Sequence, residues 1–353
     1  MERNLVTIEV VQEIKPIEGA DNIEMARVRG AWWCVVKKNE FKVGDVGVYF
    51  EIDSMLPLAD PRFAFLRRPD DKPDKTHHRL RTRKCLGQIS QGLLLPYAIF
   101  AEQLNIDDEW NFEEIAKAGT CDVIDVARVL GIEKFEPPIP ACLAGEVLGT
   151  FPNFIPKTDQ ERVQNLNWEN IKDHKYEVTV KMDGSSMTAY LKDGHFGVCS
   201  RNLELKETEK NTFWKLAREY GLEERLRRVG RNVAIQGEAV GEGINGNRAK
   251  MKGQHLYIFD VFDIDNNRKM LPIERMEFLS LLTFGFDFRP ITSVPISDIV
   301  VDCNSIQDIV DFASTHPSPH ANSDLIEGLV FKAMDCNFSF KAISNRYLLK
   351  HNE

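Results

Sequence analysis

The first hundred residues consist of short strand-like runs separated by turn-rich segments such as "EGADNIE" and "DSMLPLADP". Little of this region has the apolar spacing of an amphipathic helix. Five short strands with almost no helix predict a small β-barrel, with another small barrel or a sandwich as the alternative. The predicted strands are Leu5–Val11, Ile23–Arg29, Trp32–Lys37, Val46–Glu51 and Gly92–Leu95.

The 353 residues suffice for about two domains. Residues 1–100 form the predicted barrel, for which the oligonucleotide-binding (OB) architecture is the common five-stranded version. Residues 101–150 combine helical sequence with the proline-interrupted "FEPPIPACLAG" and are predicted to connect the domains. Residues 151–353 mix strands and amphipathic helices, which predicts an α+β domain. Its helices are predicted at Asn211–Tyr220, Leu222–Val229, Ile273–Leu282 and Ile306–Ser314.

Charge and cysteine content limit the partners and the compartment. The net charge is −9, so nucleic acid can be bound only at a local basic patch. One candidate is "THHRLRTRK" (76–84), which contains no acid, although a solvated basic loop would have the same composition. The seven cysteines form no Cys-x-x-Cys pair, which favours reduced thiols over a zinc site. Without a signal peptide or a membrane-spanning run, we expect an intracellular protein, cytoplasmic rather than in an organelle.

A lysine ends a predicted strand in "VTVKMDGSSM" (178–187). Val178 and Val180 lie on one face of this strand, and Lys181 lies on the other. The dipeptide "DG" supplies a turn, because glycine reaches positive φ freely and aspartate bonds to its own backbone. The pattern predicts a strand–turn–strand unit, and taken alone it also fits a solvated lysine beside a hairpin.

Four further stretches place charged residues on apolar strands. In "AIQGEAV", Glu238 lies on the face opposite Ile235, and in "FSFKAIS", Lys341 is separated by parity from the phenylalanines. In "IEGLVFKA", parity puts Glu327 and Lys332 on opposite faces, so they share a site only if the strand bends or bulges. The stretches are "CSRN" (199–202), "IQGEAVGEG" (235–243), "LYIFDVFDI" (256–264), and the pair "IEGLVFKA" (326–333) with "FSFKAIS" (338–344).

Together these stretches resemble the covalent nucleotidyltransferases, a superfamily that comprises ATP-dependent RNA ligases, DNA ligases and mRNA-capping guanylyltransferases. The Lys-x-Asp-Gly motif is matched by Lys181-Met182-Asp183-Gly184, and the other motifs follow in the family's order. The resemblance covers residues 150–353. The remaining matches are Ser200-Arg201-Asn202, Glu238, Phe259, Glu327 and Lys341.

Within this superfamily the chain is most similar to RNA ligases that carry their OB domain before the catalytic domain. The stretches "GQISQGLLLP" (87–96) and "KTDQERVQN" (157–165) look like that group. Only twelve residues follow Lys341, which leaves no room for the C-terminal OB domain of DNA ligases and capping enzymes. The resemblance implies a multidomain protein with an N-terminal OB-fold β-barrel and an α+β nucleotidyltransferase domain with antiparallel sheets.

The implied activity is ATP-dependent RNA ligation in RNA repair. An RNA ligase of this kind joins 3′-hydroxyl and 5′-phosphate ends through a lysyl-AMP intermediate and an adenylylated 5′ end. The nucleophile, Lys181, must be neutral, yet at an ordinary pKa only about one lysine in 2,500 is neutral at pH 7. We therefore expect burial, Lys341, Lys332 and a divalent metal to lower its pKa.

The resemblance also implies roles for individual residues. Two departures from the family's pattern are Val180, where some relatives have a polar residue that reads adenine, and Ser339, where some have a second lysine. The residues expected to bind nucleotide are Arg201, Glu238, Phe259, Glu327, Arg162, Gln164 and Val180; those expected to bind Mg²⁺ or Mn²⁺, directly or through water, are Asp183, Glu238 and Glu327; those expected to bind phosphate or nucleic acid are Arg79, Arg81 and Arg83.

The expected partners are RNA ends in duplex or nicked RNA, with no membrane and no obligate protein partner. The OB domain would either grip nucleic acid or bring basic side chains to the pyrophosphate leaving group. The enzyme alternatives are a DNA ligase or a capping-type nucleotidyltransferase. The non-enzyme alternative is an OB-containing nucleic-acid-binding protein with a degenerate transferase domain.

Overall fold

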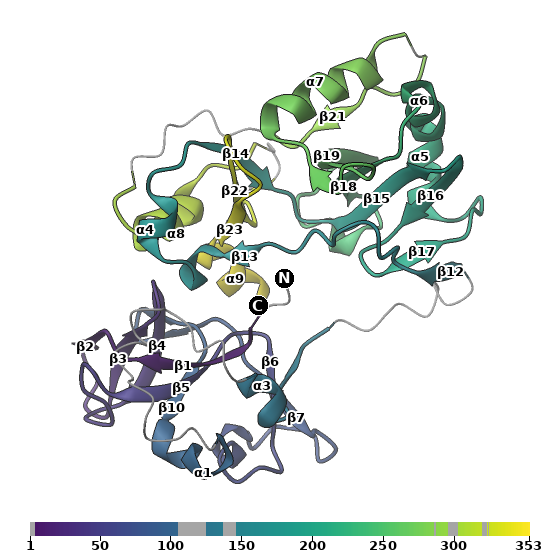
Figure 1. The fold of residues 1–353 in the computed structure, drawn as a ribbon. Coiled ribbons are helices and arrows are strands. Elements are labelled where there is room, and N and C mark those ends of the chain that lie inside the picture. Colours follow the sequence, from purple (N-terminus) through teal and green to yellow (C-terminus); the bar gives the residue numbers. More distant parts are fainter. Residues whose placement is uncertain are drawn as a thin grey trace.

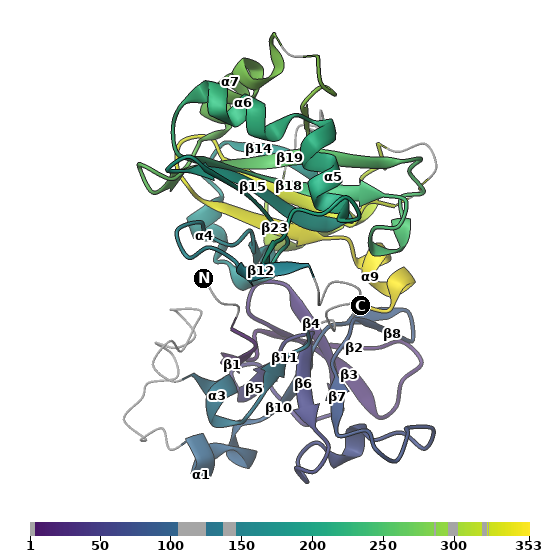
Figure 2. The same cartoon turned by 90° about the vertical axis from the view of Figure 1, so that its right-hand side faces the viewer.

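The computed structural model describes residues 4–104, 125–136, 146–285, 287–295, 303–319, 323 and 325–353. A smaller N-terminal domain lies against one side of a larger domain, and the C-terminal helix lies between the two (Figures 1 and 2). Among the described helices, none combines the length and the apolar character that crossing a bilayer requires.

The N-terminal domain is an OB-fold domain, as predicted, and is built from short antiparallel strands. All five strands expected from the sequence are present. Strand β5 lies between β1 and β10, and β3 lies between β2 and β4. The strands are β1 (Val6–Val10), β2 (Glu13–Pro16), β3 (Ile23–Val28), β4 (Trp32–Lys37), β5 (Val46–Phe50), β6 (Ser54–Pro57), β7 (His77–Arg79), β8 (Arg83–Cys85), β9 (Gln88–Ser90) and β10 (Leu93–Pro96).

The described parts of the predicted connector pack on one domain or the other. Leu104, Val126 and Ile132 are buried in one cluster with the strands of the OB domain. Strand β12 (Val147–Thr150) instead pairs with a strand of the second domain. The rest of the connector, residues 105–124 and 137–145, lies outside the described residues, and the boundary near residue 150 stays a prediction. The short elements here are η1 (Ala64–Leu66), η2 (Tyr97–Ile99), α1 (Ala101–Leu104), α3 (Val126–Val129) and β11 (Glu133–Lys134).

Two sheets form the second domain. The larger has the order β12-β17-β16-β15-β18-β19-β20, with β21 on β19, and the smaller has the order β13-β23-β22-β14. Their pairing is antiparallel as predicted, except for two short parallel pairs, β13 with β23 and β21 with β19. The strands are β13 (Glu161–Arg162), β14 (Tyr176–Lys181), β15 (Ser185–Lys192), β16 (His195–Cys199), β17 (Leu203–Leu205), β18 (Val233–Gly241), β19 (Gln254–Asp263), β20 (Arg268–Lys269), β21 (Thr292–Ser293), β22 (Gly328–Ala333) and β23 (Ser339–Ile343).

The four predicted helices cover these sheets. Helices α5, α6 and α7 bury their apolar faces on the larger sheet, and α8 buries its face on the smaller one. Side-chain caps begin two of them, because Asn211 accepts from the backbone at the start of α5 and Ser305 does so for α8. The helices are η4 (Val163–Asn165), α4 (Trp168–Ile171), α5 (Thr212–Glu219), α6 (Leu222–Val229), η5 (Asn245–Asn247), α7 (Pro272–Thr283), α8 (Ile306–Thr315) and α9 (Asn345–His351).

The two domains share an apolar cluster. Ile343 and Leu348, from the end of β23 and from α9, are buried together with OB-domain residues that include Trp32. Polar contacts surround the cluster: the Trp32 indole donates to Asn165 Oδ1 at 2.6 Å, and Asn165 donates to Glu51 at 3.2 Å. The C-terminal segment of the larger domain is therefore packed as part of the smaller domain's core.

A buried ion pair joins helix α7 to the smaller sheet. Arg275 Nη2 of α7 donates to both carboxylate oxygens of Glu177 in β14, at 2.5 and 2.7 Å. The side chains of Arg275 and Glu177 are only 3% and 6% exposed, so removing one of them would leave the charge of the other buried without a partner. Removing one member of such a pair is far more costly than replacing both.

We therefore expect Glu177→Ala to lower the free energy of unfolding by about 3–5 kcal/mol, because it leaves the Arg275 guanidinium buried and uncompensated. Urea unfolding followed by circular dichroism measures this. The double variant E177L/R275M removes both charges and should lose less than E177A. A loss in E177A no larger than that of the double variant would contradict the assignment.

Candidate active site

The chain crosses from one sheet to the other at Lys181. Strand β14 of the smaller sheet ends at this residue, and β15 of the larger sheet begins at Ser185. The strand registers place Lys181 opposite Gly328 in β22, and Ser186 opposite Glu238 in β18. Acids from both sheets are thereby brought to the turn "KMDG", which stands in the cleft between the sheets.

Two glycines are required by the close approach of these strands. A Cβ at Gly184 would lie 2.2 Å from the carbonyl oxygen of Ala239, and a Cβ at Gly328 would lie 2.2 Å from that of Ala342. Both distances are far below van der Waals contact. The glycines therefore let the backbone beside Asp183 and beside Glu327 pack against its neighbour.

An ion pair holds the lysine. Lys181 Nζ lies 2.8 Å from Glu327, and its side chain is 27% exposed. Burial lowers the pKa of Lys181, but the charges of Glu327, Glu238 and Asp183 raise it by more, so the net direction is upward. Burial and the two lysines therefore do not lower the pKa as expected, because acids dominate the surroundings of the amine; the lowering expected from a divalent metal stays a prediction.

The three carboxylates exceed the positive charge that faces them. Burial and the neighbouring acids raise the pKa of Glu238 to about 8, against the opposing effect of Lys181. Burial also raises the pKa of Glu327. Hard oxygen donors that carry surplus negative charge suit Mg²⁺ or Mn²⁺, so the residues predicted to bind metal fit such an ion.

Asp183 is held by two side chains of the segment that follows β18. Asn245 Nδ2 donates to Asp183 Oδ1 at 2.7 Å, and Arg248 Nη1 lies 3.8 Å from Asp183 Oδ2. Neither Asn245 nor Arg248 was predicted from the sequence as a partner of Asp183. Both lie in the polar, glycine-rich stretch "GEGINGNRAK" (241–250), which follows the strand that carries Glu238.

A bulge in β19 directs Phe259 toward the smaller sheet. The register with β18 shifts between Gln236–Asp260 and Gly237–Ile258, which leaves Phe259 as the extra residue. Its ring is half-buried and packs against the core of the smaller sheet, whereas Phe262 is 3% exposed and belongs to a separate core cluster. Phe259, and not Phe262, therefore has a face available to a nucleotide base.

Lys332 contacts Phe259 and Asp260 of strand β19. Its amine donates to Asp260 Oδ1 at 2.6 Å and to the Phe259 carbonyl, and burial lowers its pKa. Asp260 also binds Lys269 at 3.1 Å, and these two lysines hold the pKa of Asp260 far below its usual range against the effect of burial. Lys332 therefore fixes the backbone at Phe259, from which the ring projects.

Lys341 acts on two acids of the site. Its charge opposes the rise that burial causes in the pKa of Glu327, and together with Arg201 it lowers the pKa of Asp159 against the effect of burial. Asp159 binds Arg201, with Nη2 at 2.8 and 3.1 Å from the two carboxylate oxygens. Asp159 was not predicted, although it lies in the stretch "KTDQERVQN".

Arg162, Gln164 and Val180 have other neighbours. Arg162 is buried at the domain interface, with Nε 3.9 Å from Glu51 and its guanidinium over the ring of Trp32. Gln164 is buried in η4, and the Val180 side chain lies in the core of the smaller sheet. Nucleotide contact by these three residues stays a prediction.

The basic OB residues lie along one segment beside α9. Arg79 binds Asp53 at 2.7 Å and stacks on Phe135, so it is engaged within its own domain. Between Arg81 and Arg83, the amide of Thr82 donates to the carbonyl of Glu353 at 2.8 Å. Burial and neighbouring cations lower the pKa of Arg81 and of Arg83, as expected where guanidinium groups are crowded together.

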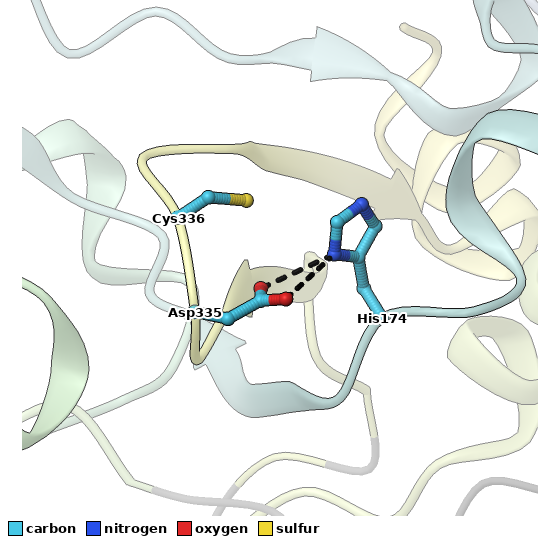
Figure 3. Close-up of side chains that lie close together, drawn as sticks. All are labelled: His174, Asp335 and Cys336. Carbon is cyan, nitrogen blue, oxygen red and sulfur yellow. Dashed lines mark hydrogen bonds and ion pairs between the residues drawn. The ribbon is translucent and has the colours of Figure 1, made fainter.

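Figure 3 shows a second group of possible metal ligands, formed by His174, Asp335 and Cys336. His174 Nδ1 lies 3.1 and 3.3 Å from the Asp335 carboxylate oxygens, and the ligand atoms all lie within 4.8 Å of one another. His174 precedes β14 by two residues and is seven residues from Lys181, which ends that strand, and an extended chain rises about 3.3 Å per residue. It is separate from the cleft, and the histidine–aspartate ion pair alone accounts for its geometry.

Comparison with known families matches both domains. A family model described as "OB-fold domain" matches residues 5–97, and one described as "RNA ligase" matches residues 174–343. No curated protein matches the chain.

Solved structures of Naegleria gruberi RNA ligase are similar to the chain over nearly all of its length. A mutant of that ligase with ATP and Mn is 47% identical, with a TM-score of 0.88 over 99% of this chain and 100% of that chain. The ligase with PPi is 46% identical, with a TM-score of 0.84 over 99% of each chain. An apo mutant is 45% identical, with a TM-score of 0.87 over 99% of each chain.

The raised pKa of Glu238 predicts how stability changes with pH. The folded protein favours the neutral carboxyl, so its contribution to stability is complete below pH 4.5 and is lost as the pH rises to about 8. Without divalent ions, Glu238→Gln should therefore melt at a higher temperature than the wild type at pH 8.5. Each kcal/mol raises the melting temperature by roughly 2–4 °C in a domain of this size.

The difference should shrink toward pH 4.5, and calorimetry across the pH range measures it. Glu242→Gln, an exposed acid in the same segment, serves as the matched control and should follow the wild type. A pH-independent difference for E238Q would show that the carboxyl is not held neutral by the fold.

Proposed function

The chain belongs to the RNA ligase family, and on that premise we propose that it seals 3′-hydroxyl and 5′-phosphate RNA ends with ATP through a covalent intermediate on Lys181. The arrangement of Lys181 supports this assignment best. The amine ends a strand, pairs with Glu327 at 2.8 Å and lies close enough to Glu238 and Asp183 for their charges to raise its pKa. No element of a purely nucleic-acid-binding protein requires a half-buried lysine among three acids.

In the first step, the lone pair of Lys181 Nζ attacks the α-phosphorus of ATP. A phosphoramidate bond forms to AMP, the bond between the α-phosphorus and its bridging oxygen breaks, and pyrophosphate leaves. The amine must first lose a proton. Glu327, at 2.8 Å and with a raised pKa, is placed to accept it.

The acids of the cleft would hold Mg²⁺ or Mn²⁺ through Asp183, Glu238 and Glu327, directly or through water. Such an ion supplies positive charge that offsets the carboxylates and the phosphates. Solved structures of the Naegleria relative contain ATP with Mn and AMP with Mn. Phe259 offers a flat apolar face to adenine, and its position is fixed by Lys332 through the Phe259 carbonyl.

In the next two steps, AMP passes to the 5′-phosphate of RNA, and a 3′-hydroxyl then attacks that phosphate and releases AMP. We propose that duplex or nicked RNA is the substrate and that RNA repair is the role. We also propose a cytoplasmic location without an obligate protein partner. The thiols of Cys34, Cys85, Cys199 and Cys336 form no disulfide, which supports this location.

Incubation with α-labelled ATP and Mn²⁺ tests the assignment. The wild type should gain one label per chain, and Lys181→Ala should gain none, because the proposed intermediate forms on this amine. Lys192→Ala, a half-buried lysine at the other end of β15, is the matched control and should be labelled like the wild type. An unlabelled wild type, or equal label on K181A, would overturn the proposed function.

The role of the OB domain is best tested at Arg81 and Arg83. We propose that these side chains approach the pyrophosphate leaving group, because their segment touches the end of α9 beside the cleft. R81A and R83A should each slow lysine adenylylation by about tenfold, the value of one charge-assisted hydrogen bond. Sealing of a pre-adenylylated strand should change less.

Lys42→Ala, an exposed OB-domain lysine elsewhere, controls for net charge. An unchanged first step with slowed sealing would instead assign the arginines to gripping RNA. Equal losses in both steps would also contradict a role confined to the leaving group.

A further inference from the structure

A cluster beneath the "KMDG" turn connects Asp183 to the C-terminal helix. Arg248 Nη1 bonds to the Tyr347 hydroxyl, lies 2.9 Å from Glu353 Oε1 and lies 3.8 Å from Asp183 Oδ2. The guanidinium also faces the Tyr347 ring, 5.6 Å from its centroid. A small cavity of about 30 Å³ is lined by Lys181, Asp183, Arg248 and Tyr347 among others, so the cluster is part of the wall beneath the nucleophile.

Asp183 is nearly enclosed by this cluster. Its side chain is 9% exposed, and the remaining oxygen accepts from Asn245 at 2.7 Å. Burial, the charge of Glu327 and a hydrogen bond to Asp183 raise the pKa of Tyr347, so the phenol lies close to both acids. Contacts from two separate segments, 245–248 and α9, thus bear on one carboxylate.

Helix α9 ties the same cluster to the OB domain. Tyr347 faces Arg248, while the next residue, Leu348, is buried in the apolar cluster that contains Trp32. At the end of the helix, the Glu353 carbonyl accepts from the Thr82 amide at 2.8 Å. Helix α9 therefore contacts Arg248 through Tyr347 and packs on the OB domain through Leu348.

We propose that Arg248 and Tyr347 are positioning residues that fix the Asp183 carboxylate beside Lys181, and that packing of α9 on the OB domain holds them in place. The inference rests on the proposed function, since it assigns the cluster to the lysine adenylylation step. The OB domain thereby acts on the first step through protein contacts, in addition to any contact with phosphate. A role of α9 limited to filling the domain interface is the alternative.

Single-turnover adenylylation with α-labelled ATP and Mn²⁺, measured across ATP concentrations, distinguishes the two. Arg248→Gln should lower the maximal rate by about tenfold or more, because it removes the cation shared by Tyr347 and the two acids. The ATP concentration at half-maximal rate should change less than twofold. Arg248→Lys should recover part of the rate, since it keeps the charge but not the fork of donors.

The matched control is Arg227→Gln, which removes an exposed arginine paired with Glu223 on α6. It should behave like the wild type. Tyr347→Phe keeps the ring and its packing, so a lower rate in this variant reports on the hydroxyl alone. If R248Q and Y347F are folded and adenylylate at the wild-type rate, the inference is wrong while the proposed function stands; an unlabelled wild type would remove both.

Coupling to the OB domain is tested by a double-mutant cycle. Leu348→Ala loosens the apolar packing of α9 and should also slow adenylylation. If α9 acts through Arg248, the double variant R248Q/L348A should be little slower than R248Q alone. Two results would show that α9 serves the interface and does not position Asp183. One is that the fold-losses in adenylylation rate of the two single variants multiply in the double variant. The other is that the rate of L348A falls only in proportion to the fraction of L348A that is unfolded.

Discussion

The ion pair between Lys181 and Glu327 is the interaction on which the rest of the site depends. It fixes the amine in the cleft and places a carboxylate of raised pKa within proton-transfer distance. It also has a cost for reactivity, because the three acids raise the pKa of the lysine. The same acids that orient the nucleophile therefore hold it in the protonated form until positive charge offsets them.

The path of the chain explains why these groups meet. Lys181 ends a strand of one sheet, and four residues later the chain has entered the other, so both sheets contribute acids to a single turn. Glycines beside two of the acids allow the strands to approach closely. The buried pairs Glu177–Arg275 and Asp260–Lys332 join elements of the two sheets and hold the cleft between them.

The sequence was informative where local pattern determines structure. The five OB strands, the helices of the second domain and the strand–turn–strand unit at Lys181 followed from apolar period and turn residues, and the motif order indicated the family. Parity separated Glu327 from Lys332, and in the structure the two have different partners, because Glu327 pairs with Lys181 and Lys332 with Asp260. Features that arise between distant segments are encoded by no local pattern. They are the bulge that turns Phe259, the ion pair of Lys332 with Asp260, and the contacts of Asn245, Arg248 and Tyr347 with one another or with Asp183.

The central claim is that Lys181 is a lysine held protonated by acids and made reactive when bound positive charge offsets them. Its pKa can be measured directly by NMR of selectively labelled lysine, with K181A to assign the signal. The account predicts a pKa above the ordinary 10.5 in the free protein and a clear fall when Mg²⁺ and a non-hydrolysable ATP analogue are bound. A pKa already well below 10.5 in the free protein, or one that does not fall on binding, would contradict it.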